Sequence, residues 1–157
     1  MKRVLSVVVP LAGIVVLTVA VGAGAATRGH SGGGHGKSLT VIEHATSDTT
    51  TDTGATGDSG GDILTFANDV FDAADATKVG TDQGYCIRIV AATSYECTWT
   101  TSLAGGQIVV SGPFFDKKDS TLAITGGTGR YRHARGTMDL RSREGGAKFA
   151  FVFHLKG

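Results

Sequence analysis

Apolar and polar residues alternate in short segments along most of the chain after residue 38. The clearest is 148–155, in which phenylalanine recurs at every second position from Phe149 to Phe153. A period of two is typical of a β-strand with one buried face. Segments of this kind predict eight strands, at 39–45, 63–71, 84–91, 95–103, 107–115, 121–125, 134–141 and 148–155. No segment has a sustained helical period, so the pattern indicates an all-β fold.

Short turns rich in glycine separate several of these segments. Gly105-Gly106 and Gly145-Gly146 each precede a strand, and glycine suits such turns because it tolerates positive φ. Short connections imply antiparallel order, and eight antiparallel strands close into an up-and-down barrel. A barrel of this size is filled by side chains or holds one small ligand. We therefore predict an eight-stranded antiparallel β-barrel over residues 39–157, with a two-sheet sandwich as the alternative.

The first 25 residues have a different pattern. A basic start, Lys2-Arg3, precedes an apolar run over 4–21, and the small-residue motif Ala-Gly-Ala follows at 23–25. This order is typical of a secretory signal peptide, so we predict that residues 1–25 are removed and that the protein is secreted. An uncleaved membrane anchor is the alternative, because the run of about 18 residues is just long enough to span a bilayer.

Two polar stretches follow the signal peptide. Residues 26–38 are rich in Gly, Ser and His and predict a flexible linker. His30 and His35 lie in it, but two histidines lack the third and fourth ligands that a metal site needs. Residues 46–60 are rich in Thr, Asp and Gly, cannot bury a core, and predict a long loop.

The charge of the chain excludes one class of partner. Lys2 and Arg3 are two of the 15 Lys and Arg residues, so thirteen remain beyond residue 25, against 14 Asp and Glu. Nucleic-acid binding usually relies on a positive surplus, so no nucleic-acid partner is predicted. Acidic residues predominate over 48–82 and basic residues from 130 onward. Such residues usually point outward on a barrel, which favours a solvated face over a binding patch.

Several motifs of known chemistry are absent or incomplete. The glycine-rich run at 125–130 has neither the Lys-Ser/Thr ending of a phosphate-binding loop nor a following helix, and it predicts a corner between strands. No nucleophile elbow marks a catalytic serine. Two cysteines cannot provide a zinc site. No metal and no organic cofactor is therefore predicted.

Two cysteines and two other polar residues fall within predicted strands. Cys86 and Cys97 lie on adjacent hairpin strands, and secretion favours a disulfide between them; the alternative is a free Cys86 that lines the cavity. Glu43 follows Val41-Ile42, and Asn68 follows Phe66-Ala67. An inward Glu43 would be buried, and its raised pKa would make it a candidate acid, base or charge stabiliser. Alternation alone does not decide which way Glu43 points.

The chain resembles the plant allene oxide cyclases. The similar residues are Gly-Asp-Ile-Leu-Thr-Phe-Ala-Asn at 61–68, Val-Gly-Thr at 79–81, Gly-Tyr-Cys at 84–86, Gly-Pro-Phe-Phe at 112–115 and Leu-Ala-Ile-Thr-Gly-Gly-Thr-Gly at 122–129. The likeness covers most of 61–155, together with 39–43. The Gly-Gly-Thr-Gly corner is shared with a wider set that includes the dirigent proteins. The resemblance implies a small eight-stranded barrel and, from the related plant barrels, a possible homotrimer.

The resemblance also implies roles for five residues. Allene oxide cyclases convert an unstable fatty-acid epoxide into a cyclopentenone inside the barrel. Glu43 matches their catalytic carboxylate, which promotes charge delocalisation, and Cys86 matches a cysteine that lies along the substrate. Asn68 matches a residue that helps hold a water on the epoxide oxygen. Phe66 matches an aromatic residue beside the substrate, and Phe114 stands where the family has a tyrosine at the cavity mouth.

The chain departs from the family at three places. Ala45 stands where the family has a second water-holding asparagine. A Ser-Pro of the plant enzymes falls in the region that 46–60 replaces. Cys97 has no equivalent in the plant enzymes, and a bond to it would remove the Cys86 thiol.

Two hypotheses of different classes follow. The first is a secreted barrel enzyme that isomerises or cyclises a hydrophobic small molecule, with Glu43 as the central polar residue. The second is a non-catalytic secreted barrel that binds an apolar ligand, as dirigent proteins do, or that serves only a structural role.

Overall fold

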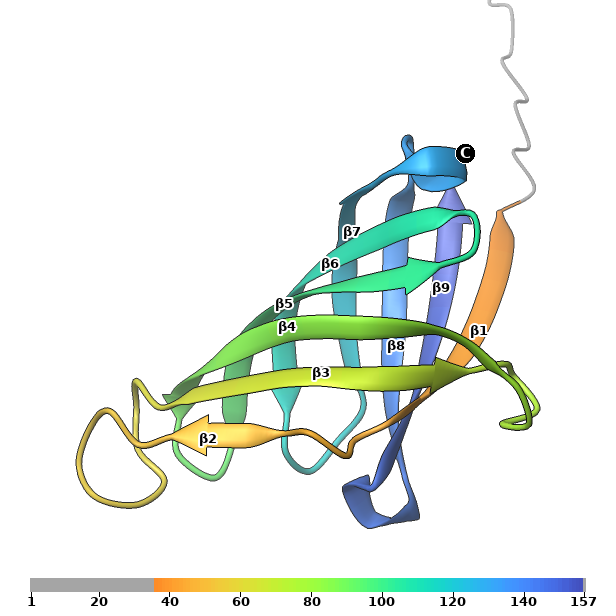
Figure 1. Cartoon of the computed structure of the whole chain (residues 1–157). Coiled ribbons are helices and arrows are strands. Elements are labelled where there is room, and N and C mark those ends of the chain that lie inside the picture. The colour runs from red at the N-terminus through yellow and green to blue at the C-terminus, as the bar shows by residue number, and fades with distance from the viewer. Residues whose placement is uncertain (1–35, 157) are drawn as a thin grey trace, which may run out of the picture. The chain divides into compact units, whose positions relative to one another are not determined.

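Nine β-strands and two short 3₁₀ turns make up residues 36–156, the part of the chain that the computed structural model describes (Figure 1). The elements are β1 (Lys37–His44), β2 (Thr49–Thr51), β3 (Ile63–Phe71), β4 (Lys78–Val90), β5 (Ser94–Leu103), β6 (Gly106–Phe115), β7 (Ser120–Gly127), η1 (Gly129–Tyr131), β8 (Arg135–Arg143), η2 (Glu144–Gly146) and β9 (Lys148–Lys156). The predicted signal peptide and most of the predicted linker, with His30 and His35, lie outside the described residues. Lys37 and Ser38, expected in the linker, already belong to β1.

The strands form a closed antiparallel barrel. Sheet order runs β1-β9-β8-β7-β6-β5-β4-β3, and β1 also pairs with β3, which completes a ring of eight strands. This confirms the predicted eight-stranded barrel. The strands hydrogen-bond with one another and enclose their own core, so we expect the barrel to fold without residues 1–25. The structure is of one copy, and the expected homotrimer stays a prediction.

The ninth strand, β2, lies in the stretch that the sequence predicted to be a long loop. The end of β1 pairs with the last residues of β3, and β2 pairs with the first residues of the same strand, from Thr49↔Thr65 to Thr51↔Ile63. β1 and β2 are therefore two parts of one interrupted ladder along β3. The prediction of loop was wrong for 49–51 because exposed threonines at a sheet edge bury no apolar face.

A second difference is the length of β4, which begins at Lys78 instead of residue 84. Its first half places Gly80 and Asp82 on the inner face, with the exposed Thr81 between them. This half lacks the inward apolar residues on which strand prediction depends.

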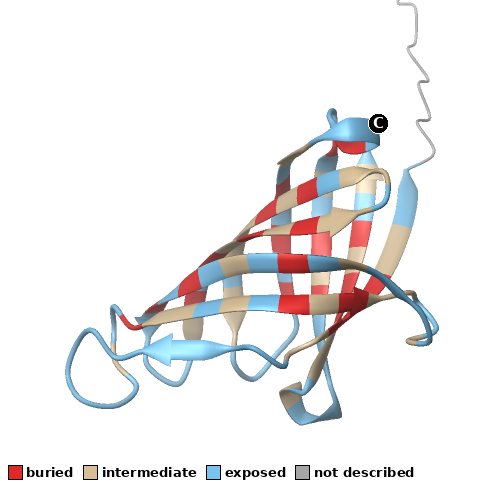
Figure 2. Ribbon diagram, in the orientation of Figure 1, coloured by how far each residue is buried: buried red, intermediate tan, exposed pale blue. Residues whose placement is uncertain are grey.

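Buried residues alternate with more exposed ones along most strands of the barrel and form its core (Figure 2). The largest fully buried side chains are those of Phe151 and Phe153 on β9, as the period of two predicted. Most other members of the core are aliphatic or aromatic: Val41, Val70, Tyr95, Trp99, Ile108, Val110, Leu122, Ile124, Tyr131, Met138 and Leu140.

A smaller cluster lies outside the barrel wall. Ile42 and Ala150 are fully buried although they face away from the core residues next to them in sequence. The connection between β3 and β4 contacts the next pair on the same face, His44 and Lys148: Asp75 in this connection accepts a hydrogen bond from Lys148 Nζ (2.8 Å) and pairs with His44 Nε2 (2.6 Å). Val41 and Glu43 are buried in the barrel and Ile42 in the outer cluster, so three consecutive residues of β1 are buried.

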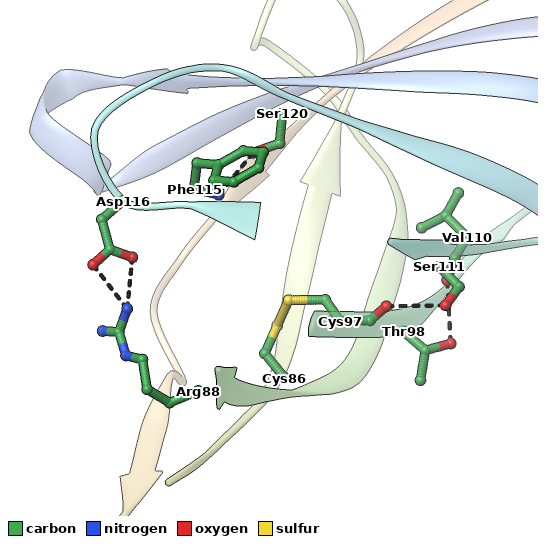
Figure 3. The surroundings of a disulfide bond; sticks show 9 residues. All are labelled: Cys86, Arg88, Cys97, Thr98, Val110, Ser111, Phe115, Asp116 and Ser120. Carbon is green, nitrogen blue, oxygen red and sulfur yellow. Dashed lines mark hydrogen bonds and ion pairs between the residues drawn. A yellow bond between two sulfur atoms is a disulfide. The ribbon is translucent and has the colours of Figure 1, made fainter. Parts of the chain in front are cut away.

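One disulfide joins β4 to β5 (Figure 3). Cys86 and Cys97 are directly opposed in the antiparallel register, with their Cα atoms 4.0 Å apart. The structure therefore contains the bond that secretion led us to favour. Beyond it, Arg88 Nη1 donates to both carboxylate oxygens of Asp116 at 2.8 Å, and its guanidinium stacks on Tyr95 at 3.6 Å. These contacts tie the end of the β4–β5 hairpin to the β6–β7 connection.

No helix within residues 36–156 is long and apolar enough to cross a membrane.

Removing the disulfide is expected to destabilise the barrel. For Cys86→Ala/Cys97→Ala we expect the free energy of unfolding to fall by about 3 kcal/mol, because the bond closes a loop across a separation of 11 residues in the unfolded chain. Urea unfolding followed by the fluorescence of the single tryptophan measures this. A midpoint equal to that of the oxidised wild type, or two alkylatable thiols in the non-reduced wild type, would contradict it.

Candidate functional site

A cavity of about 60 Å³ opens at the end of the barrel where β9 begins and β6 ends. Its wall is mainly aromatic and aliphatic, with two carboxyl groups and one disulfide; the lining residues are Glu43, Asp48, Leu64, Phe66, Cys86, Cys97, Trp99, Phe114, Leu140, Phe149 and Phe151. The wall is thus apolar except at Glu43 and Asp48. A space of this size has room for several water molecules or for part of a small ligand.

The aromatic wall depends on a glycine opposite the tryptophan. Gly84 on β4 pairs with Trp99 on β5, and a Cβ at residue 84 would collide with Trp99. Phe66 on β3 pairs with Gly84 and meets the indole edge-on, with ring centroids 6.0 Å apart. Trp99 also packs against Phe151, at 5.4 Å. The missing side chain at Gly84 therefore leaves room for the aromatic wall.

Glu43 points inward from the end of β1, with 5% of its surface exposed. Asn68 Nδ2 donates a hydrogen bond to Glu43 Oε1 at 2.8 Å and another to Asp48 Oδ1 at 2.8 Å. The amide of Asn68 therefore holds both carboxyl groups that line the cavity.

The amide oxygen of Asn68 stabilises the break between β1 and β2. Asn68 Oδ1 accepts hydrogen bonds from the backbone N–H groups of Thr46 (3.0 Å) and Ser47 (2.9 Å), and from the Ser47 hydroxyl (2.9 Å). The Ser47 hydroxyl also contacts the backbone of Ala67, accepting from its N–H at 2.9 Å. Asn68 thus uses its whole hydrogen-bonding capacity on the protein.

Asp82 on β4 lies behind Glu43, with 2% of its surface exposed. It pairs in register with Asn68, whose backbone N–H donates to Asp82 Oδ1 at 3.2 Å. The second oxygen, Asp82 Oδ2, has no hydrogen-bond partner among the described residues. A hydrogen bond between the Glu43 and Asp82 side chains needs a proton on one of them.

The two carboxyl groups have raised pKa values for physical reasons. Burial raises the pKa of Glu43 from 4.5 to about 9, with a further contribution from the negative charge of Asp82 and opposition from the Asn68 hydrogen bond. Burial also raises the pKa of Asp82 from 3.8 to about 6. Two buried carboxyl groups that interact directly do not both ionise at neutral pH, so the pair holds one proton there.

The structure brings four of the five residues predicted at the site to the cavity. Glu43, Phe66, Phe114 and Cys86 line it, whereas Asn68 lies behind Glu43. Cys86 lines it as half of a disulfide and therefore has no thiol; its predicted catalytic role is replaced by the alternative pairing with Cys97. Among the described residues no group of three metal-ligating side chains is present.

Sequence reasoning missed Asp82 and Trp99. The signal was available, because side chains two apart on a strand share a face. Asp82 lies on the same face of β4 as Gly84 and Cys86, two and four residues later. Trp99 lies on the same face of β5 as Cys97. An inward Cys86–Cys97 pair would have placed both residues in the barrel.

The raised pKa values give a testable pH dependence of stability. In the unfolded chain both carboxyls lose their protons near pH 4, whereas the folded pair releases its protons near pH 6 and pH 9. The folded state therefore binds more protons over this range, and the free energy of unfolding is expected to fall by on the order of a few kcal/mol from pH 5 to pH 9. Urea unfolding at a series of pH values measures the slope.

The variant Glu43→Gln is expected to remove most of this slope, since its amide can donate to Asp82 without titrating. Glu96→Gln, at an exposed position of β5, is the matched control and should keep the wild-type slope. A slope that Glu43→Gln leaves unchanged would contradict the assignment of the pH dependence to this pair.

The fold and part of the sequence match known proteins. The chain aligns over 76% of its length with all of a pyocyanin demethylase, at a TM-score of 0.67 and 24% identity. It aligns over 78% of its length with 97% of a pterocarpan synthase dirigent protein, at a TM-score of 0.59 and 19% identity. The Diels-Alderase AbmU from Streptomyces koyangensis matches over 80% of this chain and 71% of its own length, at a TM-score of 0.63 and 16% identity.

At these identities the three likenesses show a shared fold. The family model described as "Allene oxide cyclase barrel like domain" matches residues 42–152. This span runs from the inward end of β1 into β9 and includes β2 to β8 and the whole cavity wall. The chain is a member of the allene oxide cyclase-like barrel family.

Proposed function

We propose that this barrel binds an apolar small molecule in its cavity and isomerises or cyclises it, with Glu43 as the acid. The observation that carries the proposal is a buried carboxyl group with a raised pKa in the wall of an otherwise apolar cavity. A perturbed titratable group in such a place is the usual mark of a catalytic site. The similarity to a Diels-Alderase fold supports a barrel of this kind as a host for ring-forming chemistry.

The protonation state of Glu43 sets its role. A carboxyl group whose pKa is raised to about 9 is protonated at neutral pH. Glu43 therefore acts as a hydrogen-bond donor or general acid, rather than as the carboxylate that the resemblance to plant enzymes implied. Asp82 and Asn68 are positioning residues: the first shares the proton, and the second orients the carboxyl plane.

The reaction needs no co-reactant. When the substrate binds, the Glu43 proton turns from Asp82 to an oxygen of the substrate, and this hydrogen bond stabilises the negative charge that develops as a C–O bond opens. The electron pair of that bond moves to the oxygen, and a new bond closes within the same molecule. Substrate and product share one formula, and the Glu43–Asp82 pair ends with the proton it began with.

The cavity wall supports the same chemistry. Aromatic and aliphatic side chains exclude water, so that one hydrogen bond to a developing charge is worth more than in solution. The Cys86–Cys97 bond fixes two adjacent wall strands to each other. A rigid wall favours one conformer of a flexible substrate and therefore one stereochemical outcome.

The disulfide also supports a location for this activity. Disulfides persist in oxidising environments outside the cytosol. Together with the signal peptide predicted for residues 1–25, the bond supports a secreted protein.

Non-catalytic binding of an apolar ligand is the second candidate function. The observation that favours it is the saturation of Asn68, whose amide has no hydrogen-bonding capacity left for the water that the family's reaction uses. Ala45 offers no second amide for that water. In this case the barrel orients a ligand whose reaction is completed elsewhere.

Glu43→Gln separates the two functions. With a cyclisable fatty-acid epoxide as substrate, we expect turnover to fall by about 100-fold or more, because the variant keeps the shape of the carboxyl but lacks its acidic proton. Chiral chromatography of the product measures rate and stereochemistry. Ligand binding, followed by the fluorescence of Trp99 in the cavity wall, should be retained.

Glu96→Gln is the matched control and should retain turnover. An unchanged rate and product in Glu43→Gln would overturn the catalytic proposal. Binding without product formation in the wild type would leave the non-catalytic function as the one supported.

Asp82→Asn tests the shared proton. Removal of the neighbouring negative charge lowers the pKa of Glu43, so the alkaline fall in kcat/KM should move from about pH 9 to a lower pH. The pH–rate profile measures this shift. An alkaline limb at the wild-type position would contradict a role for Asp82 in setting the pKa of Glu43.

A further inference from the structure

The end of the barrel opposite the cavity carries a concentration of basic side chains. The strands that meet there are the start of β1, the end of β9 and the start of β8, with η1 beside them (Figure 1). All of its basic residues are exposed, and they come from both ends of the described sequence: Lys37, Arg130, Arg132, His133, Arg135 and Lys156. The sequence pattern favoured a solvated face over a binding patch for the basic residues from 130 onward, and the fold places five of them beside Lys37 at one end of the barrel.

These basic side chains are unpaired among the described residues. None of the six forms an ion pair there, whereas Lys78, Arg88, Arg141 and Lys148 each pair with a carboxylate. Thirteen Lys and Arg against 14 Asp and Glu beyond residue 25 leave this part of the chain slightly acidic. The positive end is therefore a local feature, and its charge is available to an external anion.

A hollow of about 640 Å³ lies among these residues. Its apolar floor consists of Leu39, Tyr131, Ala134 and Leu155, and its basic rim consists of Lys37, Arg130, His133 and Lys156. Arg130 is held in place on this rim, because its Nη2 donates to the Tyr131 hydroxyl at 2.8 Å and its guanidinium stacks on the Tyr131 ring. An apolar floor within a rim that carries Lys37, Arg130 and Lys156 matches an amphiphile with a negative head group.

The place where the described chain enters the barrel favours a membrane as the source of that amphiphile. The described chain enters the barrel at Gly36-Lys37, within the basic end itself. The predicted membrane-inserting segment ends near residue 25, ten residues earlier. Ten residues span at most about 35 Å even when fully extended. While the predicted leader is in a membrane, this limit keeps the basic end of the barrel near the membrane surface.

We propose that the basic end of the barrel is a docking surface for a membrane that carries anionic phospholipids. Lys37, Arg130, His133 and Lys156 contact the lipid phosphates, and the apolar floor of the hollow faces the glycerol and upper acyl region. Each Lys or Arg near such a surface adds to the attraction. Because the cavity opens at the other end of the barrel, the docked protein presents Glu43 and the aromatic wall away from the lipid.

Sedimentation with vesicles tests this surface. The protein is the chain from residue 26, which contains the whole closed barrel, and the vesicles are phosphatidylcholine alone or mixed with phosphatidylglycerol. We expect binding to the mixed vesicles only, reduced by high salt, which screens exposed charges. Binding to both vesicle types alike, or to neither, would overturn the proposal.

Two matched charge reversals locate the contact. Lys37→Glu/Lys156→Glu changes the rim and should weaken binding by about tenfold or more. Lys117→Glu/Lys118→Glu changes the net charge equally in the β6–β7 connection, at the cavity end, and should weaken it much less. Equal weakening by both pairs would assign binding to net charge and overturn the proposal.

Thermal unfolding shows that each variant is folded before its binding is compared. A soluble short-chain phosphatidylglycerol distinguishes a membrane surface from a free ligand. If the wild type binds it as monomers as tightly as it binds vesicles, the hollow is a site for a free amphiphile, and the docking proposal is overturned.

Discussion

The site depends on how the sheet closes between β1 and β3. Backbone pairing there covers only Ile42 to His44 before the ladder breaks, and it resumes at β2. Inside a barrel a broken ladder leaves backbone donors that need partners. Asn68 supplies the acceptor for two of them and at the same time donates to Glu43. Asn68 thus satisfies the backbone groups at the break between β1 and β2 and also orients the Glu43 carboxyl group. Closure of the barrel and the geometry of the site are therefore coupled.

The small radius of an eight-stranded barrel explains the electrostatics of this site. Inward side chains crowd together, and a polar group in the interior must pair with another interior group. Glu43 on β1 and Asp82 on β4, the two strands that flank β3, share a proton, which keeps an acid protonated at neutral pH. Because of this pair, the free energy of unfolding is expected to fall as pH rises. A local loss of stability of this kind is common at functional sites. Two further inward polar atoms, Trp99 Nε1 and Thr101 Oγ1, also lack partners within the described residues.

The two ends of the barrel have different chemistry. One end holds the aromatic cavity. Near it the disulfide joins β4 to β5, and the Arg88–Asp116 ion pair joins β4 to the β6–β7 connection. The other receives the N-terminal segment and gathers unpaired cations around an apolar hollow. Antiparallel up-and-down topology produces this separation, because every second connection lies at the same end. Residues far apart in sequence, such as Lys37 and Arg130, therefore share one surface.

The sequence by itself determined the strand pattern and the closed barrel, because alternation and turn glycines are local signals. It also identified Glu43, Phe66 and Phe114 as cavity residues through family resemblance. Tertiary structure alone decided that Glu43 points inward, since its outward neighbour Ile42 is also buried and hides the alternation. It also decided the Cys86–Cys97 bond, the shared proton with Asp82 and the gathering of the cations. Each of these depends on which strands become neighbours, and strand register is set by packing across the whole barrel.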